Sequence, residues 1–96
     1  MKKIFKYPLD ADYDGVTARW EPCKAIELPS GAQILSVAIQ GGNPVMWALV
    51  NPDAPMEKRK IYISNTGGEL SDDFGRHRFI GTLLFGGGKI VLHVFE

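Results

Sequence analysis

The sequence has 96 residues, and its 45% hydrophobic and 23% charged content is typical of one soluble globular domain spanning residues 1–96. Eleven Lys and Arg balance eleven Asp and Glu, so the formal net charge is zero, which disfavours nucleic acid or an anionic membrane surface as a partner. No segment approaches the roughly 18 apolar residues of a membrane-spanning helix. The lone cysteine, Cys23, cannot close an intrachain disulfide, and this favours a reducing compartment.

Glycine and proline divide the chain into short segments. The 11 glycines and 6 prolines leave intervals of about five to eight residues, which suit strands better than helices. Strands are expected at residues 3–7, 24–28, 33–40, 45–50, 60–64, 78–85 and 89–95. The sequence therefore predicts an all-β fold, a single small antiparallel domain shaped as a compact barrel or sandwich of about six or seven short strands. We expect at most one or two helical turns, near residues 52–57 or 71–74.

An acidic connecting loop at residues 10–23 joins the first two expected strands. Within it, residues 10–21 match the fixed positions of an EF-hand calcium loop, which combines alternating oxygen ligands, a glycine at the turn and a closing glutamate. The expected ligands are Asp10, Asp12, Asp14, Val16 through its carbonyl, and Glu21. Pro8 and Pro22 prevent the two helices that normally flank such a loop. Two interpretations stay open: a helix-less Ca²⁺ site, the only cofactor the sequence suggests, and a solvated acidic connection.

The third and fourth expected strands form a hairpin. Alternation in the third strand places Leu35, Val37 and Ile39 on one face. A Gly-Gly-Asn-Pro break then precedes the fourth strand, which is almost continuously apolar. The charged run at residues 57–60 is expected to be a solvated loop before the fifth strand.

The last two expected strands flank three glycines, and their hydrophobic pattern decides the register. A two-residue turn drawn from these glycines places Phe79, Leu83, Leu92 and Val94 on one apolar face. A loop one residue longer would bring Lys89 onto that face, and burying its ammonium group costs far more than the turn geometry returns. We therefore expect an even loop. The last strand is expected to present an uncovered edge, and such an edge favours a homodimer.

The chain offers little material for catalysis. A nucleophile and its base would have to come from Cys23, His77 and His93, and these residues form neither a catalytic nor a zinc-binding pattern. We therefore expect no catalytic residue and no enzyme activity. Side chains exposed on the outer faces of strands suit contact with a partner protein. The expected contacts are Tyr7, Tyr62, His93 and Phe95.

Four stretches of the sequence form a pattern that covers most of the chain in order. They are residues 4–9 (IFKYPL), 26–37 (IELPSGAQILSV), 47–50 (WALV) and 92–96 (LHVFE). Together they resemble a family of small, functionally uncharacterised proteins of tailed bacteriophages and prophages. The resemblance implies a phage origin and expression in the cytoplasm of the host bacterium, and it brings no catalytic residue and no ligand.

The expected function follows from this resemblance together with the lack of a catalytic pattern among Cys23, His77 and His93. We expect a non-enzymatic phage or prophage accessory protein that binds a host protein and acts in host takeover or against host defence. The alternative is a β domain that binds a small ligand or Ca²⁺. Neither nucleic acid nor a membrane is an expected partner.

Overall fold

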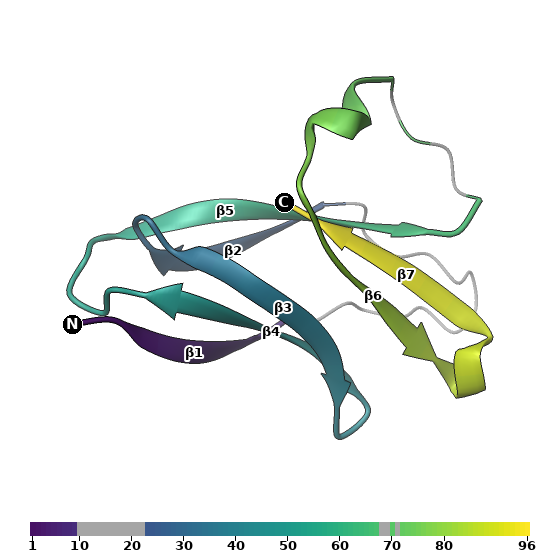
Figure 1. Ribbon diagram of the computed structural model, residues 1–96, viewed down its shortest axis with the longest axis horizontal. Helices are drawn as coiled ribbons and strands as arrows, with labels where there is room; N and C mark the ends of the chain where they lie inside the picture. The colour runs from purple at the N-terminus through teal and green to yellow at the C-terminus, as the bar shows by residue number, and fades with distance from the viewer. Residues whose placement is uncertain (10–22, 68–69, 71) are drawn as a thin grey trace.

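The computed structural model describes residues 1–9, 23–67, 70 and 72–96. Within these residues the chain forms strands and two short 3-10 helices (Figure 1). The strands are β1 (Lys3–Pro8), β2 (Cys23–Pro29), β3 (Gln33–Gln40), β4 (Asn43–Val50), β5 (Met56–Asn65), β6 (Phe79–Phe85) and β7 (Ile90–Phe95), and the 3-10 helices are η1 (Asp72–Arg76) and η2 (Gly86–Gly88). The predicted all-β fold is confirmed, and one of the two expected helical turns coincides with η1.

The strands form two antiparallel sheets, one with the order β1-β4-β3 and the other with the order β2-β5-β7-β6. Strands β3 and β6, which are edge strands of different sheets, lie side by side (Figure 1). This arrangement fits the sandwich form of the predicted fold. Because β7 lies between β5 and β6, the expectation that the last strand presents an uncovered edge is wrong. The predicted homodimer loses that support.

One hydrophobic core lies between the inner faces of the two sheets. Strands contribute every second residue to it, because successive side chains of a strand point to opposite faces. The largest fully buried side chains are Leu9, Leu28, Ile34, Met46, Val50, Ile61, Leu83, Leu92 and Val94. Across the described residues no polar or charged side chain is buried, so removal of apolar surface from water is what holds the sheets together.

A β-bulge interrupts each of the two strands that meet between the sheets. The register shifts after Ile34 in β3 and after Phe79 in β6, and one extra residue reverses the alternation beyond that point. Ile34 is therefore buried, whereas Leu35 is 41% exposed, which corrects the expectation that Leu35 shares the face of Val37. Phe79, expected on the apolar inner face, is 54% exposed for the same reason.

The predicted register of the C-terminal hairpin is confirmed beyond the bulge. Leu83 lies opposite Leu92 and Gly81 opposite Val94, so the loop is even. The side chains of Leu83, Leu92 and Val94 are buried.

Gly81 lies at the junction where β6 meets β3. A Cβ atom built on Gly81 would lie 2.8 Å from Cγ2 of Val37, which is closer than non-bonded carbon atoms pack. The missing side chain at position 81 therefore lets the two sheets come together.

Candidate binding site

The charged run at residues 57–60 lies in β5 and not in a loop, which corrects the expectation. Over this stretch β5 pairs with β2. Side chains alternate along a strand, so Arg59 lies on the side of buried Ile61, whereas Lys60 and Tyr62 share the outer face. The cations of this run are therefore positioned by the part of β5 that precedes its pairing with β7, which begins at Tyr62.

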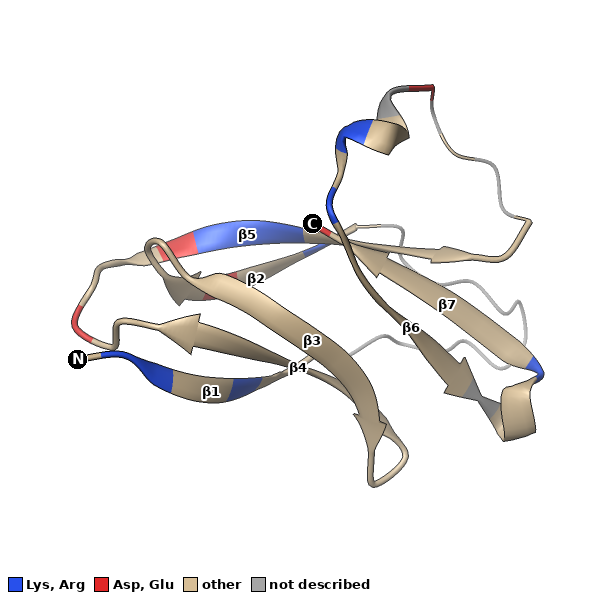
Figure 2. Ribbon diagram, in the orientation of Figure 1, with Lys and Arg blue, Asp and Glu red and all other residues tan. Residues whose placement is uncertain are grey.

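A shallow pocket of about 430 Å³ opens beside β5. It is lined by Arg59, Lys60, Tyr62, Arg76, His77, Arg78 and Glu96. These residues come from β5, from the segment between η1 and β6, and from the position after β7. Four of the lining side chains are cations and one is a carboxylate, so the pocket has a positive potential. Figure 2 shows the basic stretches of β5 and of the segment before β6 near the acidic end of the chain.

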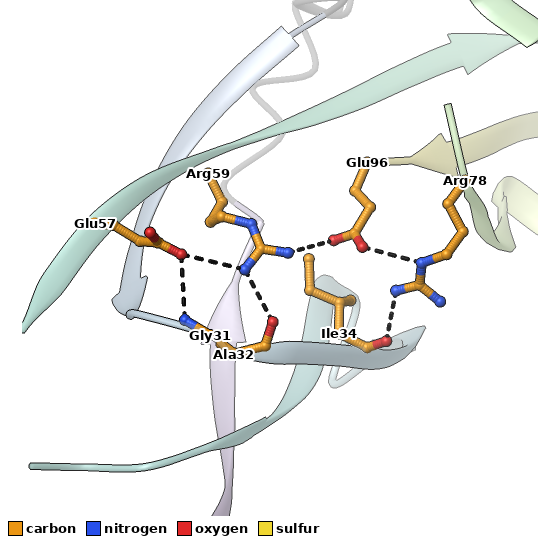
Figure 3. Close-up of polar contacts among 7 residues, drawn as sticks. All are labelled: Gly31, Ala32, Ile34, Glu57, Arg59, Arg78 and Glu96. Carbon is orange, nitrogen blue, oxygen red and sulfur yellow. Dashed lines mark hydrogen bonds and ion pairs between the residues drawn. The ribbon is translucent and has the colours of Figure 1, made fainter. Parts of the chain in front are cut away.

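Glu96 holds two arginines at the inner side of the pocket. Its Oε2 lies 3.1 Å from Nη2 of Arg59, and its Oε1 lies 3.0 Å from Nε of Arg78 (Figure 3). The Glu96 side chain is only 18% exposed, so these contacts are less screened by water than a surface ion pair. The backbones of Arg78 and Glu96 also exchange two hydrogen bonds of 3.0 Å, which extend the β6–β7 ladder.

The same two arginines donate to backbone carbonyls just before and within β3, an edge strand of the other sheet. Arg59 Nη1 donates to the carbonyl oxygen of Ala32 at 2.9 Å, and Arg78 Nη2 donates to that of Ile34 at 2.9 Å (Figure 3). Ile34 lies at the β3 bulge, where the ladder is disrupted and a carbonyl needs another donor. Arg59, Arg78 and Glu96 therefore form a polar clamp between the two sheets, and both guanidinium groups are already engaged.

Aromatic rings cover the outer face of the four-stranded sheet next to the pocket. The ring centroids of Tyr62 and His77 are 4.2 Å apart, and those of Phe74 and His77 are 4.9 Å apart. Phe95 contacts Phe74 at 4.8 Å and Phe79 at 5.4 Å, both edge to face. We call these five residues the aromatic cluster. Pairs of this geometry stabilise one another beyond simple burial, so the cluster is a preformed surface.

Two cations of the pocket are not engaged by their surroundings. In the part of the chain that the structure describes, no hydrogen bond or ion pair reaches the side chain of Lys60 or Arg76. Both residues are exposed. The positive charge that a ligand would meet in the pocket is therefore carried by these two side chains.

Three of the four predicted partner contacts lie on this outer face. Tyr62 is opposite Phe95 in the β5–β7 ladder, and His93 lies two residues before Phe95 on the same side. The His93 ring is fixed at both nitrogens, with Thr66 Oγ1 2.8 Å from Nε2 and Thr82 Oγ1 3.1 Å from Nδ1.

The fourth predicted contact, Tyr7, lies elsewhere. It is in β1 of the three-stranded sheet and packs against the core. Burial raises the pKa of its hydroxyl above the usual value of 10.0. The structure therefore brings Tyr62, His93 and Phe95 together and separates Tyr7 from them.

The expected calcium ligands Asp10, Asp12, Asp14, Val16 and Glu21 lie outside the described residues, so the Ca²⁺ site stays a prediction. Among the residues that are described, no group of three or more His, Cys, Asp or Glu side chains could hold a metal ion. None of the helices in that part of the chain is long and apolar enough to span a membrane.

The basic half of the site was not predicted from the sequence. The charged run at residues 57–60 was expected to be a solvated loop, and no role was expected for Arg76, Arg78 or Glu96. The available signal was the alternation of Lys60 and Tyr62 with Ile61 and Ile63, which predicted the strand at 60–64 and also indicates that this strand has a polar outer face.

The fold and the site define a two-sheet β domain with an aromatic cluster beside a cation-rich pocket. The chain belongs to a family described as a Domain of unknown function (DUF7352), whose model matches residues 1–96. Comparisons with curated proteins and with solved structures found no match. A proposal of function therefore depends on the site and on the sequence resemblance described above.

Proposed function

We propose that this protein is a bacteriophage or prophage accessory protein that binds a protein of its bacterial host in the cytoplasm and works without catalysis. The resemblance of the sequence to phage proteins supports the origin. The aromatic cluster on the outer face of the four-stranded sheet is the observation that supports protein binding. Its Phe79 ring is 54% exposed, and aromatic residues are enriched at the centres of protein interfaces.

The organisation of the cluster suits an interface. Its rings hold one another in place through the contacts of Phe74 with His77 and Phe95. Side chains that are ordered before binding lose little conformational entropy when a partner arrives. The neighbouring pocket adds cations at the rim, where they steer association and select the partner. Hydrophobic rings with a basic rim are thus the proposed binding surface.

The experiment compares two exposed phenylalanines on different sheets. Wild-type protein, Phe79→Asp and Phe5→Asp are immobilised and exposed to bacterial lysate, and the captured protein is identified, purified and titrated against each variant. Phe5 is 39% exposed on β1, so it controls for loss of any exposed ring. We expect Phe79→Asp to weaken binding by about tenfold or more, the effect of one interface hot spot, and Phe5→Asp to leave it unchanged.

Circular dichroism and urea unfolding of each variant confirm that the fold is intact before binding is compared. Equal affinity of the partner for wild type and Phe79→Asp would refute the proposed surface. Capture of no protein at any salt concentration, together with a metabolite held tightly by the purified protein, would refute the proposed function.

A further inference from the structure

We propose that the pocket binds carboxylate side chains of an acidic segment of the partner protein, with Lys60 and Arg76 as the two cations that bind them. This inference rests on the proposed function, because it takes the ligand to be part of a protein. It adds the chemistry of the segment that is recognised and the two residues that recognise it.

The four pocket cations differ in whether they already have partners, and this difference identifies Lys60 and Arg76 as the ligand-binding cations. Arg59 and Arg78 each contact Glu96 and each donate to a backbone carbonyl. Their charge is partly offset by that carboxylate, and their donors are used within the fold. Lys60 and Arg76 line the same pocket without such partners among the described residues, so their donors are available to an incoming anion.

The pocket has the lining for a side chain with an apolar stem. It is a shallow hollow of about 430 Å³, which suits the end of one side chain better than a whole small molecule. The Tyr62 and His77 rings, 4.2 Å apart, give it an aromatic wall beside the two cations. A glutamate can place its methylene groups against such a wall and direct its carboxylate to Lys60 or Arg76. Inorganic phosphate has no apolar part that could contact the aromatic wall.

The charge distribution favours an acidic peptide over a nucleic acid. A protein surface that binds nucleic acid needs several cations that follow the phosphate backbone. This pocket offers two available cations next to a carboxylate. The chain as a whole has no net charge. A short acidic segment needs only local complementarity, which two cations supply.

Amide chemical shifts of isotope-labelled full-length protein test the inference. The first probe is a capped synthetic peptide of alternating glutamate and leucine, the second is the same peptide with glutamine in place of glutamate, and the third is inorganic phosphate. We expect the glutamate peptide alone to shift the amides of residues 60–62 and 76–78. The glutamine peptide should bind about tenfold more weakly or not at all.

A matched set of charge-removing variants separates local from general electrostatics. The double variant Lys60→Gln with Arg76→Gln should weaken the glutamate peptide by about tenfold or more, since each charged contact contributes of the order of a kcal/mol. Lys89→Gln removes one exposed cation at the far end of β7 and should leave the affinity unchanged at physiological salt.

Three results would overturn the inference: equal binding of the two peptides, full binding by the double variant, or phosphate producing the complete set of shifts and displacing the peptide. The outcome is separable from that of the proposed function. If the lysate partner is lost with Phe79→Asp but retained by the double variant, protein binding stands and the acidic segment is wrong. If no lysate partner exists but the glutamate peptide still binds, the pocket chemistry stands and the proposed function is wrong.

Discussion

Gly81 occupies the point where β6 packs against β3, and Val37 is the residue that limits the approach. We predict that Gly81→Ala lowers the free energy of unfolding by about 1–3 kcal/mol, the usual cost of overpacking, because the new Cβ would lie 2.8 Å from Val37 Cγ2. Urea unfolding measures this directly.

Gly75→Ala is the control, since a Cβ at position 75 meets no atom within 4 Å. Its effect should be near zero or slightly stabilising. The double variant Gly81→Ala with Val37→Ala should cost about 1 kcal/mol less than the sum of the single variants, because Cγ2 is then absent. If the changes in the free energy of unfolding of the two single variants simply add in the double variant, the close contact with Val37 is not the cause of the loss at position 81.

The Tyr7 hydroxyl provides the pH-dependent prediction. Its pKa in the folded protein is raised above 10.0 by burial, so its contribution to stability is complete below about pH 10 and is lost as the pH rises through the folded-state pKa. We predict that Tyr7→Phe reduces the loss of stability in alkali, and that ultraviolet titration of wild type contains a late tyrosinate step that this variant lacks. The prediction would be contradicted if the tyrosinate step that disappears in Tyr7→Phe had its midpoint at the ordinary tyrosine pKa of about 10.

Alternation predicted the strands well, because most inward-facing positions of β4 to β7 carry an apolar residue, with Arg59 of β5 as an exception, and each chain reversal carries glycine or proline. The bulges were not predictable in the same way. A bulge adds one residue to a strand without a required residue type, and Leu35 and Ile80 are ordinary strand residues. The errors at Leu35 and Phe79 are therefore both consequences of bulges at the junction of the sheets.

The candidate site was predictable only where it followed the outer face of a strand. Tyr62, His93 and Phe95 were found because each is a ring on a polar strand face. Arg78 and Glu96 were missed because their partners, Arg59 and the carbonyl of Ile34, are distant in sequence. Such contacts depend on how the sheets pack, which periodicity does not encode.

The polar clamp gives a prediction at the level of the elements that it joins. Glu96→Gln removes the charge that pairs with Arg59 and Arg78 while keeping the side-chain shape. We predict a loss of about 1–2 kcal/mol in the free energy of unfolding, as expected for a partly buried charged contact. The measurement is the midpoint of urea unfolding, with the slope unchanged.

Glu27→Gln is the matched control for the clamp, because Glu27 is exposed in β2. It should change stability by less than about 0.5 kcal/mol. Equal effects of the two substitutions would mean that the clamp adds nothing beyond ordinary surface charge.

At the scale of the whole molecule, the homodimer remains a prediction without its original basis. Both sides of β7 are paired, so a second copy would have to use another surface, such as β1, which ends its sheet and carries the exposed side chain of Ile4. We predict the mass of a dimer in sedimentation equilibrium at high micromolar concentration, for the wild type and for Phe79→Asp alike, because the aromatic cluster is the surface proposed for the host protein. A monomer mass for the wild type over the whole concentration range would refute the dimer.

The path of the chain through the two sheets determines how the protein could be divided. β1, β3 and β4 belong to one sheet, whereas β2 belongs with β5 to β7 in the other, so no single cut sends the two sheets into different fragments. A cut in the exposed turn at residues 51–53 would leave β2 on the first piece and its ladder partner β5 on the second. The two halves would each lack a strand that the other carries. That turn is therefore the natural place to split the protein into complementing fragments whose reassembly restores the fold.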